Sequence, residues 1–381
     1  MGKGKILPLE ALRGMASILV FLWHFSLAFY PVLTGLFDPT RGLIGTPFFF
    51  LLNGHGAVTF FFTLSGFVLT YRFFCDDDTE YILSGVLKRY FRLLGPVFII
   101  VMLSFLLSKL NLYYYREAAL ISHSPWLADF GFSHADSSFN FSFSDAVNQG
   151  LFLSLLRGDF TFNSNLWIVR VELIGSFISF GAAPILAKVS KRQSFFLLLL
   201  LAGLLHFTEP YYFCFVLGTF LALQFSRKHF SLSNYRATAF TVIGLFLFSF
   251  LYPRGFYSGW DPGMSILPVE TLAVYANTAA SVLAIMVVLG NKSIHAALDS
   301  RISRILGSVS FPLYLSHPLV FFSFSSWMLI NNFSMHNAFT RLAGLFFATI
   351  GATLLVSYLL YLFDRYWIRL VNTTVKRIRA V

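Results

Sequence analysis

Long apolar segments alternate with short polar ones along most of the chain. An apolar segment of about 17–25 residues can cross the roughly 30 Å hydrocarbon core of a bilayer as a helix. The pattern predicts ten such spans, of which the fifth and sixth form a tight hairpin around Glu209 and Pro210. We therefore expect an all-α integral membrane protein, a bundle of about ten transmembrane helices. The predicted spans cover approximately residues 15–36, 47–71, 94–110, 166–186, 195–225 (the hairpin), 237–251, 268–289, 306–330 and 341–363.

The longest stretch without a predicted span is about 111–165, and it is rich in Ser, Asn, Asp and Phe. A connection of this length inside a compact protein usually carries structure or function of its own. We interpret it as an extracytoplasmic lid of short helices rather than as a second domain. Residues 1–381 are thus expected to form one transmembrane domain with a lid-like loop at about 111–165.

Composition supports an integral membrane protein and argues against other classes of protein. Hydrophobic residues make up 57% of the 381 residues and charged residues only 12%, which excludes an ordinary soluble domain. The net charge of +11 would suggest nucleic acid binding in a soluble protein, but in a membrane protein basic residues set topology. We expect no nucleic acid partner. Two cysteines, Cys75 and Cys214, are too few to indicate a disulfide framework or a metal site.

The distribution of the 28 lysines and arginines predicts the orientation of the bundle. With ten spans, 21 of them fall in the termini and in the loops on the same side, and six fall in the opposite loops. The remaining one, Arg170, lies within a predicted span. Cytoplasmic loops carry the excess of Lys and Arg. Both termini are therefore expected in the cytoplasm.

The first predicted span carries an arginine and a histidine on the same face of the helix. Arg13 and His24 are eleven residues apart, which in a helix is a rise of about 16 Å and about three full turns. If Arg13 lies at the cytoplasmic headgroup level, His24 lies near the bilayer midplane on the same face. An imidazole at that depth indicates a functional site. The alternative is a structural histidine that is hydrogen-bonded between packed helices.

The fourth predicted span carries Arg170 and Glu172, which a helix separates by about 200°, so they cannot face the same neighbour. Arg170 has two interpretations, a functional group or one member of a structural ion pair. For Glu172 we favour function, because a carboxylate close to His24 could orient the imidazole and stabilise its charged form.

Three further candidates lie just before the third predicted span or within the second. Arg89 and Arg92 share a helix face at i and i+3, and with Arg13 they could bind a multiply phosphorylated ligand. The alternative is that they anchor the topology as ordinary positive-inside residues. Ser65 precedes Gly66 in the Phe-rich second span, where small residues allow helices to approach closely. A nucleophilic Ser65 is the less favoured alternative.

Five segments follow one another along nearly the whole chain. They are Arg13 with His24, Phe61-Phe62-Thr63-Leu64-Ser65-Gly66-Phe67-Val68-Leu69, Arg89-Tyr90-Phe91-Arg92-Leu93 with Pro96, Leu166-Trp167 with Glu172, and Ser310-Phe311-Pro312-Leu313-Tyr314-Leu315-Ser316-His317-Pro318. In this order they resemble the motifs of the membrane-bound acyltransferase 3 family, the O-acyltransferases of bacterial surface polysaccharides. Position 170 departs from the family pattern, since many relatives have a small residue there, and position 311 is Phe rather than Tyr.

This resemblance implies a membrane acyltransferase of the bacterial inner membrane. We expect acyl-coenzyme A, in the form of acetyl-coenzyme A, to be a co-substrate rather than a permanently bound cofactor. Arg13, Arg89 and Arg92 would hold the phosphates of the donor. His24 would act as general base or transient acyl acceptor, oriented by Glu172. The acceptor would be a hydroxyl of a cell-surface or lipid-linked glycan. Ser65, Arg170, Tyr314 and His317 are further candidates from the matching segments.

A transporter is the rival interpretation from another class of protein. An exporter of a lipid-linked sugar could use His24 and Glu172 as an intramembrane proton relay. The chain shows neither a repeat that relates its halves nor the paired Gly- or Pro-broken helices typical of such transporters. The sequence therefore favours the acyltransferase.

Overall fold

The computed structural model describes residues 6–38, 40–133, 141–227, 230–250, 269–332 and 338–379. In these ranges the regular structure is entirely helical, as the sequence predicted. The chain divides into two compact units, which are described separately below. The first unit consists of Met1–Val20, Leu43–Arg89 and Val171–Ser308, and the second of Phe21–Gly42, Tyr90–Arg170 and Val309–Val381. The division falls within four helices, α1 (Leu7–Phe29), α4 (Thr79–Lys109), α9 (Trp167–Lys188) and α15 (Arg301–Val320).

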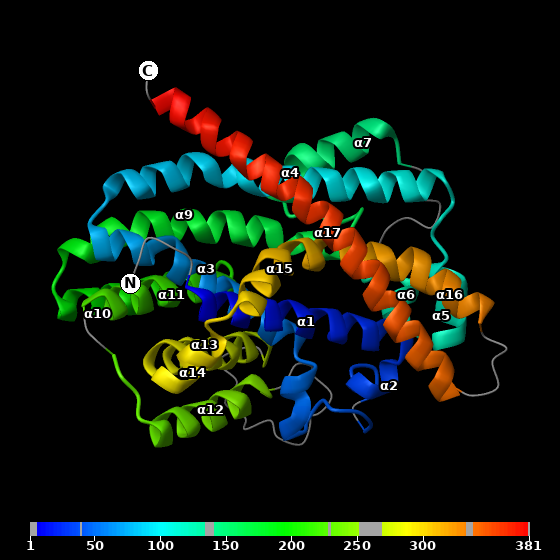
Figure 1. Ribbon diagram of the computed structural model, residues 1–381, viewed down its shortest axis with the longest axis horizontal. Helices are drawn as coiled ribbons and strands as arrows, with labels where there is room; N and C mark the ends of the chain where they lie inside the picture. The colour runs from blue at the N-terminus through cyan, green and yellow to red at the C-terminus, as the bar shows by residue number, and fades with distance from the viewer. Residues whose placement is uncertain are drawn as a thin grey trace. The chain divides into compact units, whose positions relative to one another are not determined.

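In the first unit, α3 (Gly54–Asp76) lies alongside α11 (Tyr211–Arg227) (Figure 1). Two glycines allow this close contact. A Cβ at Gly66 would collide with the backbone carbonyl of Phe215, and a Cβ at Gly218 with that of Thr63. The prediction that Ser65-Gly66 marks a close helix approach is therefore confirmed. The unit also contains η1 (Pro47–Leu51), α10 (Lys191–His206), α12 (Asn234–Phe248), α13 (Val269–Gly290) and α14 (Lys292–Leu298).

The second unit contains the predicted lid, residues 111–165, whose described helices are short. Within it α5 packs against α6, and α5 also packs against α16. Residues 134–140 of the lid lie outside the described residues. The extracytoplasmic position of the lid stays a prediction. The elements of this unit are α2 (Pro31–Thr34), α5 (Tyr115–Ser122), α6 (Pro125–Ala128), α7 (Phe143–Asn148), η2 (Gln149–Leu153), α8 (Ser154–Leu156), η3 (Ser164–Leu166), η4 (Phe321–Ser325), α16 (Ser326–Asn331) and α17 (Ala338–Arg379).

Seven helices in the described part of the chain are long and apolar enough to cross a membrane, compared with the ten spans that we predicted. The remaining three predicted spans correspond to α10, α11 and α12, which have 16, 17 and 15 residues. A helix of about 20 residues is needed to cross the hydrocarbon core perpendicular to its plane. The end of the seventh predicted span, at 251, lies outside the described residues. The count of ten and the cytoplasmic termini are not confirmed.

Several predicted helix ends are corrected by the structure. Helix α1 begins at Leu7 rather than near Met15, so Arg13 lies almost two turns inside it. Helix α4 begins at Thr79 rather than near 94, and it includes Arg89 and Arg92 on the helix face that the sequence predicted. The basic C-terminal tail continues α17 to Arg379. Lys, Arg and Glu are good helix formers, so hydropathy located the apolar part of each helix and not its ends.

Candidate active site

The second unit brings two histidines into direct contact. Nδ1 of His24, on α1, lies 2.8 Å from Nε2 of His317, on α15. The ring centroids are 5.1 Å apart with an interplanar angle of 26°. His317 is fully buried, whereas His24 is partly exposed. The structure therefore joins two of the candidates that the sequence had named separately.

The hydrogen bonds of His317 determine which nitrogen of each neutral ring carries a proton. Nδ1 of His317 lies 2.9 Å from the carbonyl oxygen of Leu313, and because a carbonyl can only accept, this nitrogen is the N–H donor. Nε2 of His317 is then the acceptor, so Nδ1–H of His24 donates to it. A neutral imidazole carries one N–H. The lone pair of His24 therefore lies on its Nε2, which is the basic nitrogen of the pair.

The side chain of Asn165 supports this assignment of the tautomers, and Pro318 explains why Asn165 lies beside α15. Pro318 has no N–H, so it leaves the carbonyl of Tyr314, four residues earlier in α15, without its helical donor. The side-chain amide of Asn165 donates to that carbonyl at 2.7 Å. The same amide nitrogen lies 3.3 Å from Nε2 of His317, which it can approach only if that nitrogen is an acceptor. The Tyr314 hydroxyl donates to the backbone carbonyl of Asn165 at 3.3 Å, which holds the two segments together.

Trp126 covers one face of the His24 ring. The two rings stack with centroids 5.0 Å apart and an interplanar angle of 15°. Trp126 belongs to α6, which begins after Ser124. The Ser124 hydroxyl accepts from the backbone N–H of Leu127 and donates to the carbonyl of Leu27 on α1, at 3.0 and 2.6 Å. This serine therefore fixes the lid helix against the helix that carries His24.

Sequence reasoning identified neither Asn165 nor Trp126 as part of the site. A usable signal existed for Asn165. A proline inside a predicted membrane helix leaves a carbonyl that must find a donor, and Asn is a suitable one. No comparable signal marks Trp126, because its contact with His24 depends on how the lid folds.

The first unit contains a second polar cluster, around Glu172 of α9. Nη2 of Arg89, on α4, forms an ion pair with Oε1 of Glu172. The Ser65 hydroxyl of α3 donates to the same oxygen at 2.8 Å. Nε of Arg89 donates to the Ser176 hydroxyl at 2.7 Å. The side chains of Arg89 and Glu172 are only 9% and 15% exposed, so this charge pair is largely shielded from solvent.

The other predicted residues lie in different surroundings. Arg13 pairs with Glu10 at 3.1 Å and is partly exposed, and Arg92 is exposed. Arg170 is also exposed, and its aliphatic part lies over Gly158. A methyl group at Gly158 would lie 3.3 Å from Cδ of Arg170, and Gly158 has a positive φ of 76°.

Each unit brings some of the predicted residues together. His24 lies with His317 in the second unit, and Glu172 lies with Arg89 and Ser65 in the first. The pairing of His24 with Glu172 stays a prediction, and so does the cluster of Arg13, Arg89 and Arg92. Chemically, the histidine pair provides a base with a fixed tautomer, and the Glu172 cluster provides a buried charge pair.

Comparison with known proteins gives one match. A family model described as an acyltransferase domain matches residues 7–362, which is nearly the whole chain and includes both clusters. No curated protein matches the chain. No solved structure matches it either.

Proposed function

The chain belongs to the acyltransferase 3 family, and from this premise we propose that it transfers an acyl group from acyl-coenzyme A to a carbohydrate hydroxyl within the membrane. The observation that carries the proposal is the hydrogen-bond chain that leaves the lone pair of His24 on Nε2. A base of this kind, held among apolar helices, suits an alcohol nucleophile that must lose its proton as it attacks.

The proposed reaction balances without any further reactant. Nε2 of His24 takes the proton of the acceptor hydroxyl while the oxygen attacks the thioester carbonyl. The carbon–sulfur bond breaks, and the sulfur of coenzyme A leaves with the electron pair. Protonated His24 then returns the proton to that sulfur, which gives an ester and the free thiol. His317 stabilises the transient imidazolium by accepting from Nδ1–H, in the manner of a residue that orients a catalytic histidine.

Arg13 and Arg92 are more accessible to the phosphates of the donor than the buried Arg89. Guanidinium groups bind phosphate oxygens in a bidentate manner, and this needs donors that a ligand can reach. Arg13 is partly exposed and Arg92 exposed, whereas Arg89 is engaged by Glu172 and Ser176. We assign the phosphates to Arg92 in the second unit, keep Arg13 as a separate candidate in the first, and assign Arg89 to holding Glu172. Acetyl is the acyl group we propose, since it needs the least space.

We further propose ten spans with both termini in the cytoplasm of a bacterial inner membrane. Helices α10, α11 and α12 would supply the three spans beyond the seven long helices, as short or membrane-thinning segments. The charge asymmetry of the loops supports this orientation. Donor would then bind on the cytoplasmic side, and the acylated glycan would form towards the outside. The family match argues against the transporter.

The test is transfer of radiolabelled acetyl from acetyl-coenzyme A to a glycan acceptor by the protein reconstituted in liposomes. We expect His24→Ala to lower the rate by about 10²–10⁴, the usual contribution of a positioned acid–base residue. The matched control is His295→Ala, a partly exposed histidine of α14 in the first unit, which should keep the wild-type rate. Full activity of His24→Ala at normal expression would contradict the proposal.

A further inference from the structure

The indole of Trp126 contacts the face of the His24 ring, which the hydrogen bonds of the site do not reach. His317 bonds to Nδ1 of His24 and so engages an edge of the ring. The indole lies almost parallel to the ring plane, with the centroids 5.0 Å apart and an angle of 15°. The lone pair of an imidazole nitrogen lies in the ring plane. The indole therefore meets the π face of His24 and does not compete with proton transfer at Nε2.

The indole is itself held by further aromatic rings of the second unit. Trp126 is only 3% exposed, and Phe322 of the π-helical turn η4 is fully buried. The centroids of these two rings are 5.4 Å apart, and Phe322 in turn stacks on Phe130 at 4.1 Å. In a close-packed cluster a side chain cannot turn without displacing its neighbours. The orientation of the indole is therefore fixed by packing before any substrate binds.

A hydrogen bond from the lid to α1 sets the position of the indole along that helix. Pro31 has no N–H, so the carbonyl of Leu27, four residues earlier, lacks the donor of a continuing helix. The Ser124 hydroxyl supplies this donor at 2.6 Å. Leu27 follows His24 by three residues, and Ser124 precedes Trp126 by two. The bond therefore joins the lid to α1 within one turn of each ring.

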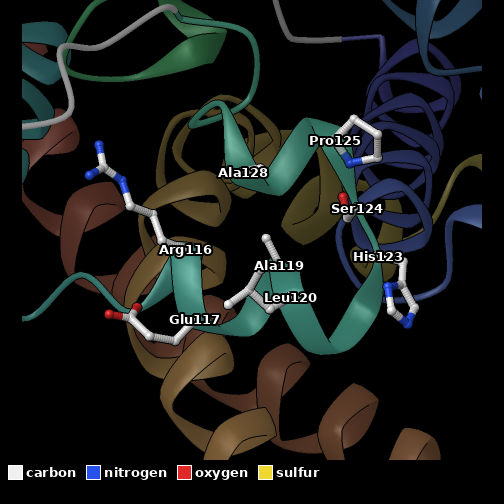
Figure 2. Close-up of a pocket in the computed structure, with 8 residues that line it drawn as sticks. All are labelled: Arg116, Glu117, Ala119, Leu120, His123, Ser124, Pro125 and Ala128. Atoms are coloured by element: carbon white, nitrogen blue, oxygen red, sulfur yellow. The ribbon is translucent and has the colours of Figure 1, made fainter.

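The start of α6 depends on this bond because α5 does not cover it completely. A hollow of about 520 Å³ lies between α5 and α6 and is lined in part by Ser124, Pro125 and Ala128 (Figure 2). Side chains of α5 do not fill this side of α6. The attachment of Ser124 to α1 therefore contributes to holding α6, and with it the indole, in place.

The proposed reaction develops a positive charge on the ring that the indole covers. His24 becomes an imidazolium when Nε2 takes the proton of the acceptor hydroxyl. A cation over an aromatic face is attracted by the quadrupole of the ring, most strongly for Trp, and the attraction grows where water is excluded. Neutral imidazole gains much less from the same contact. The stabilisation therefore increases as the transition state forms, which is the condition for a faster reaction.

We infer that Trp126 is a positioning residue of the transfer reaction. Its indole face stabilises the imidazolium form of His24, and Ser124 holds the indole at the height of that ring. This inference rests on the proposed function, because it concerns the base of the same reaction. A tryptophan that only packed the lid would be insensitive to the charge on His24, and this difference can be measured.

The test replaces Trp126 in the full-length protein, by site-specific incorporation, with mono-, di-, tri- and tetrafluorotryptophan. Fluorine withdraws electron density from the indole face and weakens its attraction for a cation, while the shape of the side chain changes little. We expect kcat for acetyl transfer to fall stepwise along the series, about tenfold in all, with both KM values unchanged. A constant kcat would overturn the inference. So would a rise in KM alone, which would place the indole against a substrate.

Substitutions with matched controls give a second comparison. Trp126→Leu should lower kcat about tenfold and Trp126→Phe, which keeps an aromatic face, about threefold. The control Trp327→Leu also removes a stacked indole, but an exposed one that lies on Phe324, and it should keep the wild-type rate. Equal kcat values in Trp126→Leu and Trp126→Phe would overturn the inference.

The role of Ser124 is tested against another N-cap serine of the lid. Ser124→Ala should lower kcat about threefold, because α6 loses both its N-cap and its bond to α1. Ser142→Ala removes the N-cap of α7, whose hydroxyl bonds to Ser144 and Asp145 in its own turn, and should leave kcat unchanged. Equal rates in the two variants would overturn the part assigned to Ser124.

A readout without acyl transfer separates this inference from the proposed function. Diethyl pyrocarbonate is attacked by the imidazole nitrogen that carries the lone pair, ethyl carbonate leaves with the electron pair of the broken carbon–oxygen bond, and the ring is cationic until Nδ1 releases its proton. Modification of the His24 peptide, followed by mass spectrometry, should slow along the fluorination series by about tenfold in all. Modification of His295 should keep a constant rate.

The two readouts together distinguish the possible failures. If the wild-type protein transfers acetyl groups but neither kcat nor the modification of His24 responds to fluorination, the inference is overturned and the acyltransferase remains. If the wild-type protein transfers no acetyl group but modification of His24 slows along the series, the proposed function fails. The stabilisation of the charged His24 ring by Trp126 then stands.

Discussion

The histidine pair of the second unit and the Glu172 cluster of the first place ionisable groups among apolar helices in different ways. His24 and His317 are joined as a neutral donor and acceptor, and their order is fixed by a backbone carbonyl at one end. Arg89 and Glu172 carry opposite charges, supplemented by hydroxyls. A neutral pair avoids the cost of a buried charge and can take up a proton. An ion pair is destabilising if either partner is lost, because the other charge then remains buried without a counterion.

This difference assigns reactivity to the histidine pair and stability to the Glu172 cluster. The histidine pair leaves a basic nitrogen with a defined orientation, which is what proton transfer requires. The charge pair engages Oε1 of Glu172 with two donors, so this oxygen contributes mainly to holding α3, α4 and α9 together. Four predictions test this division, in addition to the His24→Ala test, in order of decreasing effect.

The largest effect is expected on stability, from breaking the charge pair. Glu172→Ala leaves the Arg89 guanidinium buried without its counterion, which should lower the free energy of unfolding by about 3–5 kcal/mol. Thermal unfolding of the purified protein in detergent measures this loss. Glu172→Gln, which keeps the shape and one acceptor, should cost less. A stable Glu172→Ala protein that has lost transfer would instead make Glu172 a reactive group and break the comparison.

The next effect is on the rate of transfer, from removing the partner of His24. His317→Ala should lower kcat about 10²-fold, because the His24 tautomer is then no longer fixed. The double variant His24→Ala/His317→Ala should be no slower than His24→Ala, since residues that act as a unit are strongly non-additive. Initial rates of acetyl transfer for the four proteins of this cycle provide the measurement. Independent, multiplicative losses would show that the two histidines do not act together.

A smaller effect distinguishes two arginines that are only three residues apart. Arg92→Gln should weaken acyl-coenzyme A binding up to about tenfold, and the difference from wild type should shrink at high salt, because exposed charge pairs are screened. Arg89→Gln should mainly lower the unfolding temperature. Calorimetric titration with coenzyme A at two salt concentrations measures the first effect, with Arg157→Gln as control. Equal donor affinity in Arg92→Gln and wild type would make Arg92 a topological anchor.

The smallest effect is expected at Ser65. Its hydroxyl donates one hydrogen bond to Glu172, so Ser65→Ala should cost about 1 kcal/mol of stability and leave transfer per folded molecule near the wild-type value. Thermal unfolding and the acetyl transfer assay give the two numbers. Loss of transfer without loss of stability would restore the nucleophilic interpretation of Ser65.

The amino-acid sequence by itself determined the class of the protein and its family, and it named several of the residues that the structure brings into contact. Segments of membrane length follow from apolar composition alone, because the lipid core demands about 20 apolar residues for each crossing. Five ordered motifs were enough to indicate the family that the match over residues 7–362 confirms. The depth and spacing of Arg13 and His24 identified the first helix as the centre of the site, and α1 is indeed one helix that contains both.

Only the tertiary structure decided which residues are partners. His24 and His317 are 293 positions apart, and helical periodicity constrains a face of each helix but not the helix that it meets. The tautomer of His24 depends on a carbonyl of α15 and on an amide from the segment before α9, so it exists only once these elements pack together. In the same way, Arg89 and Arg92 look equivalent in the sequence. Packing alone made Arg89 buried and paired and left Arg92 exposed, because residues on one helix face lie at different heights along it, and Arg89 lies at the height of Glu172 and Ser176.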